Sequence, residues 1–137
     1  MFTNPPPDQI RSLLQEVKTI AVVGLSPRPD RPSYRVARAM QGFGYRIVPV
    51  RPAVSEVLGE KAYARLSDLP FVPDLVDVFR AADEVGPIVD ECIALGVGRL
   101  WLQDGVINEE AAARAREAGL TVVMDRCIWR DYVDFIP

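Results

Sequence analysis

The clearest chemical feature of the sequence is a polar loop, residues 25–33 (LSPRPDRPS), which follows a short apolar run ending in Gly24. A glycine at this point lets the backbone come close to an oxyanion, and the Ser26 hydroxyl could donate a hydrogen bond to it. Arg28 and Arg31 add positive charge, and the first N–H groups of a following helix would face the same place. The combination predicts a phosphate-binding turn. The plainer alternative is a solvated loop that only joins a strand to a helix.

This loop differs from the dinucleotide-binding fingerprint G-x-G-x-x-G. Ser26 stands at the second glycine position, and Pro27 and Pro29 stiffen the residues around it. The acidic residue that would hold the ribose of NAD about twenty residues further on is missing. Arg51 and Pro52 follow the next apolar run instead. A cation there suits a phosphorylated ribose, such as that of NADP or the 3′-phosphate of coenzyme A (CoA), so an anion site is predicted with its nucleotide left open.

The residue types that are absent limit the chemistry further. The chain has no histidine, which excludes Ser–His–Asp and Cys–His catalysis, histidine-ligated metals and a phosphohistidine intermediate. Its two cysteines, Cys92 and Cys127, cannot form a cysteine-only zinc site, and we expect both to be reduced thiols. Asp77 and Asp104 are the acid–base pair to consider, but acidic residues at strand ends more often cap helices or bind arginines. We predict no catalytic residue and no metal site.

These residues need a scaffold, and short apolar runs alternate with amphipathic stretches along the chain. The runs lack polar alternation, which is typical of strands buried on both faces. Strands are predicted at 19–24, 45–50, 75–79, 99–103 and 121–125. Between 52 and 74 we expect only a short edge strand at 61–63 and one helical turn at 66–69.

The amphipathic stretches predict helices before the first strand and between the later ones. Asp8, Asp83 and Asn108 are the expected N-caps, and Phe43 is expected on a buried stripe. The alternation predicts an α/β, Rossmann-like domain over residues 1–137. Its doubly wound, mostly parallel sheet would have about five to six strands, with helices on both faces.

In a sheet of this type, ligands bind beyond the carboxyl ends of the strands, where the strand order reverses. Arg80 follows one predicted strand and could neutralise a ligand phosphate or pair with Asp77, Asp83 or Asp104. Gln103 ends another strand, and its amide needs a partner, which could be a ligand, the loop backbone or water. The predicted site therefore gathers side chains from several strand ends.

Composition excludes several classes of partner. A formal net charge of −3 provides no basic surface for nucleic acid or anionic membrane. No apolar run is long enough to span a bilayer, and the first residues do not resemble a secretion signal. We expect a cytoplasmic protein that binds neither nucleic acid nor membrane.

Six segments form an ordered set along the chain. They are AVVGLSP (21–27), RPSY (31–34), GYRIVPVRP (44–52), VDVFR (76–80), LWLQDGV (100–106) and VVMDRC (122–127). Together they resemble the single-domain CoA-binding protein family, which is similar to the CoA-binding domain of the succinyl-CoA synthetase α subunit. The resemblance covers residues 17–134. It implies a Rossmann-like domain that holds CoA by its phosphates, adenine and pantetheine.

The resemblance also implies roles for individual positions. Gly24 and Ser26 would meet the diphosphate, and Arg51 and Pro52 would lie by the adenosine end, although the family often has asparagine where this chain has Arg51. The remaining implied contacts are Phe79 and Arg80 along the ligand, Gln103 and Gly105 beside the pantetheine arm, and Ser33 and Tyr34 at the start of the second helix. The catalytic histidine of the synthetase lies in a further domain, so its phosphoryl transfer is not implied here.

We therefore expect a domain that binds CoA or an acyl-CoA and has no catalysis of its own. One alternative is an NADP-dependent oxidoreductase, which Arg51 favours although no Tyr–Lys pair is visible. Another is an enzyme that acts on acyl-CoA thioesters through Asp104, Gln103 or Cys127. Cys127 could form a mixed disulfide with CoA, but an inert thiol is the commoner case. A homodimer, or a subunit of an acyl-CoA enzyme, is also compatible with the sequence.

Overall fold

The computed structural model describes all of residues 1–137. Five strands form one sheet: β1 Thr19–Val23, β2 Arg46–Val50, β5 Leu75–Val78, β6 Arg99–Leu102 and β7 Thr121–Met124. Every neighbouring pair is parallel, and the order is β2-β1-β5-β6-β7. The chain therefore winds one way from β1 to β2 and the other way from β5 to β7. The predicted doubly wound α/β fold is confirmed.

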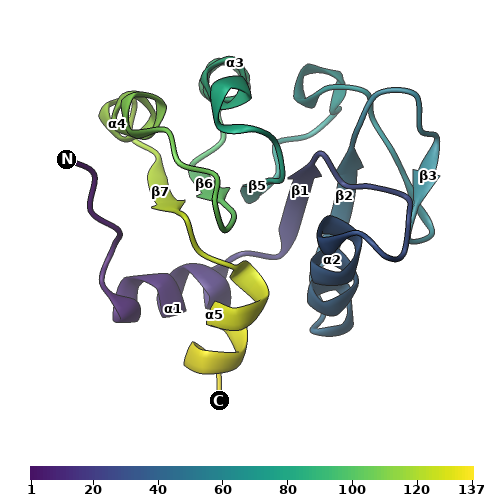
Figure 1. Cartoon of the computed structure of the whole chain (residues 1–137), viewed down its shortest axis with the longest axis horizontal. Coiled ribbons are helices and arrows are strands. Elements are labelled where there is room, and N and C mark those ends of the chain that lie inside the picture. Colours follow the sequence, from purple (N-terminus) through teal and green to yellow (C-terminus); the bar gives the residue numbers. More distant parts are fainter.

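The strands are mostly apolar because helices cover both faces of the sheet (Figure 1). Along β1, Ile20 and Val22 belong to one apolar cluster while Ala21 and Val23 belong to the other, as the two-residue period of a strand requires. Helices α1 Pro7–Glu16, α2 Pro32–Gly42 and α5 Ile128–Phe135 cover the first face. Helices α3 Val85–Leu95 and α4 Glu109–Glu117 cover the second.

The start of each helix tests the predicted caps. Asn108 caps α4 as predicted, because its Oδ1 accepts a hydrogen bond of 3.0 Å from the N–H of Ala111. The other two predictions are wrong. Helix α1 begins at Pro7, which puts Asp8 inside the first turn. Helix α3 begins after a 3-10 turn, η2 Ala82–Glu84, and that turn contains Asp83.

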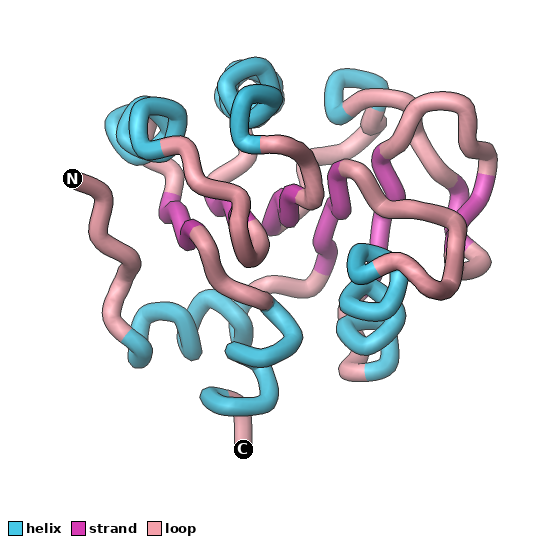
Figure 2. The backbone as a smooth tube through the Cα atoms, viewed as in Figure 1, coloured by secondary structure: helices cyan, strands magenta, loops and turns pink.

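The segment between β2 and β5 is mostly loop (Figure 2). It contains the hairpin β3 Glu56–Val57 with β4 Glu60–Lys61 and the predicted helical turn, η1 Leu66–Asp68. The predicted edge strand at 61–63 is only partly correct, since Tyr63 makes a single parallel bridge to Val50. Phe43 is not buried under α2 as predicted. It is 40% exposed and stacks on Tyr132 of α5, with ring centroids 4.0 Å apart.

One carboxyl group inside the sheet has an oxygen without a hydrogen-bond partner. Asp77, in the middle of β5, is 2% exposed, and its Oδ1 has no hydrogen-bond partner. Burial raises the pKa of this carboxyl well above its ordinary value of 3.8, because the charged form loses its hydration. The apolar faces of the helices pack against the sheet. No helix has the length and continuous apolarity needed to cross a bilayer.

Candidate functional site

The site lies where the strand order reverses, between the carboxyl ends of β1 and β5. Gly24 follows β1 with a φ of +84°, in the left-handed region that favours glycine. A Cβ on Gly24 would lie 2.3 Å from the carbonyl oxygen of Phe79 and 2.8 Å from Cδ of Arg80, which both follow β5. Only glycine therefore lets these two strand ends come this close. The place where they meet, at the reversal of strand order, is where a ligand was predicted to bind.

Two serines fix the loop after β1 against the start of α2. The N–H of Ser26 donates to Oγ of Ser33 over 3.0 Å, and the N–H of Arg28 donates to Oγ of Ser26 over 3.1 Å. Both serines are 6% exposed. The Ser26 hydroxyl thus has a structural partner that the sequence did not reveal, while its own proton stays available to a ligand. These two hydrogen bonds tie the loop to the start of α2, where no side chain caps the first N–H groups of the helix.

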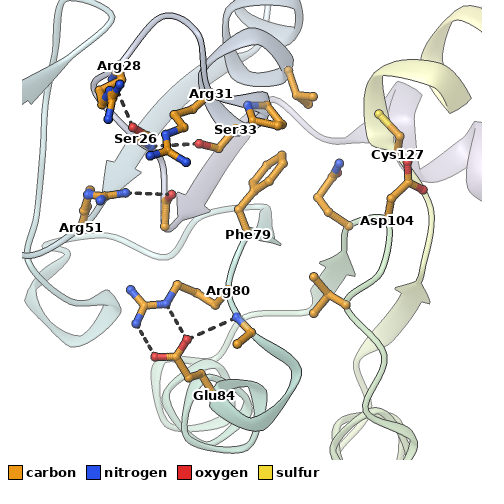
Figure 3. Close-up of a pocket in the computed structure, with 16 residues that line it drawn as sticks. Ser26, Arg28, Arg31, Ser33, Arg51, Phe79, Arg80, Glu84, Asp104 and Cys127 are labelled. Atoms are coloured by element: carbon orange, nitrogen blue, oxygen red, sulfur yellow. Dashed lines mark hydrogen bonds and ion pairs between the residues drawn. The ribbon is translucent and has the colours of Figure 1, made fainter.

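Four arginines line the resulting cavity, and they differ in how strongly the protein neutralises them (Figure 3). Arg31 and Arg51 make no ion pair, and Arg51 only donates a long hydrogen bond of 3.4 Å to the carbonyl of Gly24. Arg28 has a weak, exposed contact of 3.5 Å with Asp30. Arg80 is the exception, because Glu84 binds it through two hydrogen bonds.

The partner of Arg80 is one that the sequence analysis did not consider. We expected a ligand, Asp77, Asp83 or Asp104, and the structure shows Glu84 on the next turn. The hydrogen bonds with Glu84 raise the pKa of Arg80 and lower the pKa of Glu84. Their four-residue spacing was the signal that could have found this pair. Asp104 binds Arg130 instead, with distances of 2.8 and 3.1 Å.

The other end of the cavity is less charged. Oε1 of Gln103 accepts a hydrogen bond of 3.1 Å from the N–H of Ile128, at the start of α5, and Nε2 has no partner in the protein. Gln103 is 4% exposed, so its amide is fixed in direction and has a donor to spare. Cys127 and Asp104 lie at this end, with Phe79 between them and the arginines (Figure 3). The cavity therefore has an arginine-rich end, whose charge suits an anion, and a second end with an amide, a thiol and the carboxylate of Asp104, which Arg130 pairs.

The cavity has a volume of about 820 Å³ and is open on one side. Most of the predicted site residues line it: Gly24, Ser26, Arg28, Arg31, Ser33, Arg51, Phe79, Arg80 and Gln103. Sequence reasoning missed Pro32, Val36, Ala81, Glu84 and Val106, which also line it. Apart from Glu84, these are apolar residues in loops or a helix, and their types alone gave no signal.

Three predicted residues do not line this cavity. Tyr34 packs, partly buried, against the apolar cluster under α2. Pro52 lines a smaller neighbouring cavity. Gly105 turns the loop after β6, where its φ is +77° and its N–H donates to Oδ1 of Asp125 over 2.7 Å. Asp77 is also outside the cavity, so it does not form an acid–base pair there with Asp104.

Comparison with known proteins finds a matching family and several similar proteins. The family described as "CoA binding domain" matches residues 18–132. The uncharacterized protein YneT of Bacillus subtilis (strain 168) is 44% identical over 125 residues, which is 91% of this chain and 93% of that protein. A solved structure of a hypothetical protein from Pyrococcus horikoshii OT3 has a TM-score of 0.93 at 34% identity, covering 100% of this chain and 99% of that one.

A larger enzyme contains a related segment. The ADP-forming acetate–CoA ligase II of Archaeoglobus fulgidus is 28% identical over 95 residues. The match covers 68% of this chain but only 14% of the ligase, so most of the ligase lies outside the matched segment.

Proposed function

The chain belongs to the CoA-binding domain family, and we propose that its cavity binds CoA or an acyl-CoA without a catalytic step of its own. The observation that carries the proposal is the asymmetry of the cavity. Arg28, Arg31, Arg51 and Arg80 gather at one end, while Cys127 and Asp104, which Arg130 pairs, lie at the other. Gln103 also belongs to this second end, because it binds the N–H of Ile128, the residue after Cys127. CoA has the same asymmetry, with its phosphates at one end and a neutral amide-containing arm that ends in a thiol.

Charge supports this orientation. Four arginines line the cavity against two carboxylates, Glu84 and Asp104, although the whole chain has a net charge of −3. A local excess of positive charge in an acidic protein favours a small polyanion over nucleic acid, which would need a wide basic surface. Arg31 and Arg51 have no carboxylate partner, so they are the cations most available to phosphate.

The end of the cavity with Gln103 and Cys127 suits the pantetheine arm. Gln103 has its carbonyl occupied by Ile128 and its Nε2 free, so it can donate to an amide carbonyl of the ligand. Phe79 and Val106 offer apolar contact between the two ends. A volume of about 820 Å³ lies within the usual range for small-molecule sites. The open side would leave part of the ligand accessible to other proteins.

The first experiment is a thermal-shift series with CoA, acetyl-CoA, dephospho-CoA, NAD, NADP and ATP. At about a hundredfold excess over the dissociation constant, binding stabilises by about 2.7 kcal/mol, which raises the melting temperature by about 10 °C. We expect this shift with CoA and a smaller one with dephospho-CoA. A shift with NADP and none with CoA would replace the proposal by the oxidoreductase alternative.

Matched variants locate the phosphate contacts. Arg51→Gln and Arg31→Gln should each weaken CoA binding about tenfold or more, because a hydrogen bond to a charged group contributes about 1.5–3 kcal/mol. Arg35→Gln is the control, since Arg35 is exposed on α2 and does not line the cavity. Equal weakening by all three variants would show a general charge effect and would count against specific phosphate contacts.

The relation to the ligase adds a second element to the proposal. The chain resembles a small part of a protein named for joining acetate to CoA. We propose that it acts as a CoA-holding module for another protein or for a second copy of itself. Light scattering with and without CoA tests self-association, and a single-chain mass in both conditions would contradict the dimer.

A further inference from the structure

In the loop between β5 and α3, the carboxylate of Glu84 accepts three hydrogen bonds. Nε of Arg80 donates to Oε2 of Glu84 over 3.1 Å, and Nη2 donates to Oε1 of the same carboxylate. The N–H of Ala81 donates to Oε2 as well, over 3.2 Å (Figure 3). Glu84 therefore holds both the loop backbone and the Nε–Nη2 edge of the guanidinium, an edge that could otherwise bind two oxygens of a phosphate.

The position of this pair is unusual in the molecule. Beside the main cavity lies a smaller one of about 300 Å³, whose walls include Val50, Pro52 and Leu66. Arg80 and Glu84 line both cavities, and no other residue does. The ion pair therefore stands at the boundary between the arginine-rich end of the main cavity and a second, partly apolar space.

The pair is well placed to open. The side chains of Arg80 and Glu84 are 36% and 43% exposed, and ion pairs with this degree of exposure are weak. A phosphate that enters beside Arg31 and Arg51 would offer Arg80 a better partner than the carboxylate, because it carries more charge.

From these contacts we infer that Glu84 sets the anion affinity of the site. In the empty protein it holds Arg80, and it must release Arg80 when a phosphate-bearing ligand binds, which also joins the two cavities. The inference rests on the proposed binding of CoA. It assigns to Glu84 an opposing role, so that removal of its charge strengthens binding.

The test is calorimetry with CoA on four proteins: wild type, Glu84→Gln, Arg80→Gln and the double variant. Glu84→Gln should tighten CoA binding by about fivefold, the upper range for release of an exposed ion pair. Arg80→Gln should weaken it. The double variant should bind like Arg80→Gln alone, because Glu84 acts through Arg80.

The matched control is Asp90→Asn. Asp90 lies on α3, pairs with Arg114 and lines neither cavity. The substitution therefore removes the same charge from a comparable ion pair nearby. It should leave CoA affinity unchanged. Circular dichroism and melting temperatures establish that each variant is folded before binding is compared.

Each outcome separates the inference from the function on which it rests. If wild type binds CoA but Glu84→Gln binds equally or more weakly, the opposing role is wrong and CoA binding stands. If Glu84→Gln tightens CoA binding as much in the Arg80→Gln background as in the wild type, Glu84 acts by its own charge. The claim that it acts by releasing Arg80 is then wrong. If folded wild type does not bind CoA, both proposals fail.

Discussion

Replacing Gly24 by alanine should damage stability and binding together, because two separate costs meet at this residue. Its φ of +84° costs an alanine about 1–2 kcal/mol. The new Cβ would also lie 2.3 Å from the carbonyl oxygen of Phe79, a backbone atom that cannot rotate away. Forcing strand ends apart in a packed structure costs typically about 1–3 kcal/mol. We expect a total loss of about 2–5 kcal/mol in the free energy of unfolding.

Gly105→Ala separates the two costs. Gly105 has a similar φ of +77°, but nothing lies within 4 Å of the Cβ it would gain, and it does not line the cavity. This control should lose only the backbone cost of about 1–2 kcal/mol and should keep its affinity for CoA. The close approach of β1 to β5 is therefore measured by the difference between the two variants.

The assay is urea unfolding followed by circular dichroism, combined with calorimetry for CoA at a temperature where both variants are folded. Gly24→Ala should have the lower midpoint and should lose CoA binding, because displacement of Phe79 and Arg80 would reshape the phosphate end. Equal midpoints for the two variants would refute the argument from the close approach. Unchanged CoA affinity in Gly24→Ala would refute the placement of the ligand between the carboxyl ends of β1 and β5.

Three further predictions concern the core, a helix cap and the thiols. Burial raises the folded pKa of Asp77 above its unfolded value, so its protonated form favours the fold at low pH and stability falls as pH rises between the two pKa values, by up to about 1.4 kcal/mol per pH unit. Asp77→Asn should therefore become increasingly stabilising in urea unfolding as the pH rises above about 4, and a pH-independent effect would contradict this. Asn108→Ala should cost about 1–2 kcal/mol in the same assay by loss of the α4 cap, and a change within error would show that the cap contributes little. In the native protein an aromatic disulfide reagent should titrate Cys127 and not Cys92, which is buried with a pKa raised to about 12. CoA should slow the reaction of Cys127, and an equal rate with CoA present would place the ligand elsewhere.

The features that local sequence predicts well are those encoded by neighbouring residues. The uninterrupted apolar runs predicted the parallel strands, because a strand covered on both faces cannot alternate with polar residues. Asn108 predicted a helix start, because its side chain reaches an N–H only three residues away. Gly24 at the end of the first run marked the turn after the first strand, and the structure adds that its φ of +84° favours glycine there.

The failures concern residues whose roles depend on other parts of the chain or on the exact turn. Phe43 follows the helical period, yet α2 ends there and its ring stacks on Tyr132, far along the sequence. Asp83 has the right type for a cap, but a 3-10 turn shifts the helix start past it.

The sequence by itself determined the strands, most helices and the edge of the sheet where a ligand would bind, since these follow from hydrophobic period and from glycine and proline at fixed positions. Only the tertiary structure decided which strand-end residues share one cavity. It directs Gln103 to the start of α5 and Pro52 into a neighbouring space. These choices depend on strand order and loop path, which bring together residues that no local pattern relates.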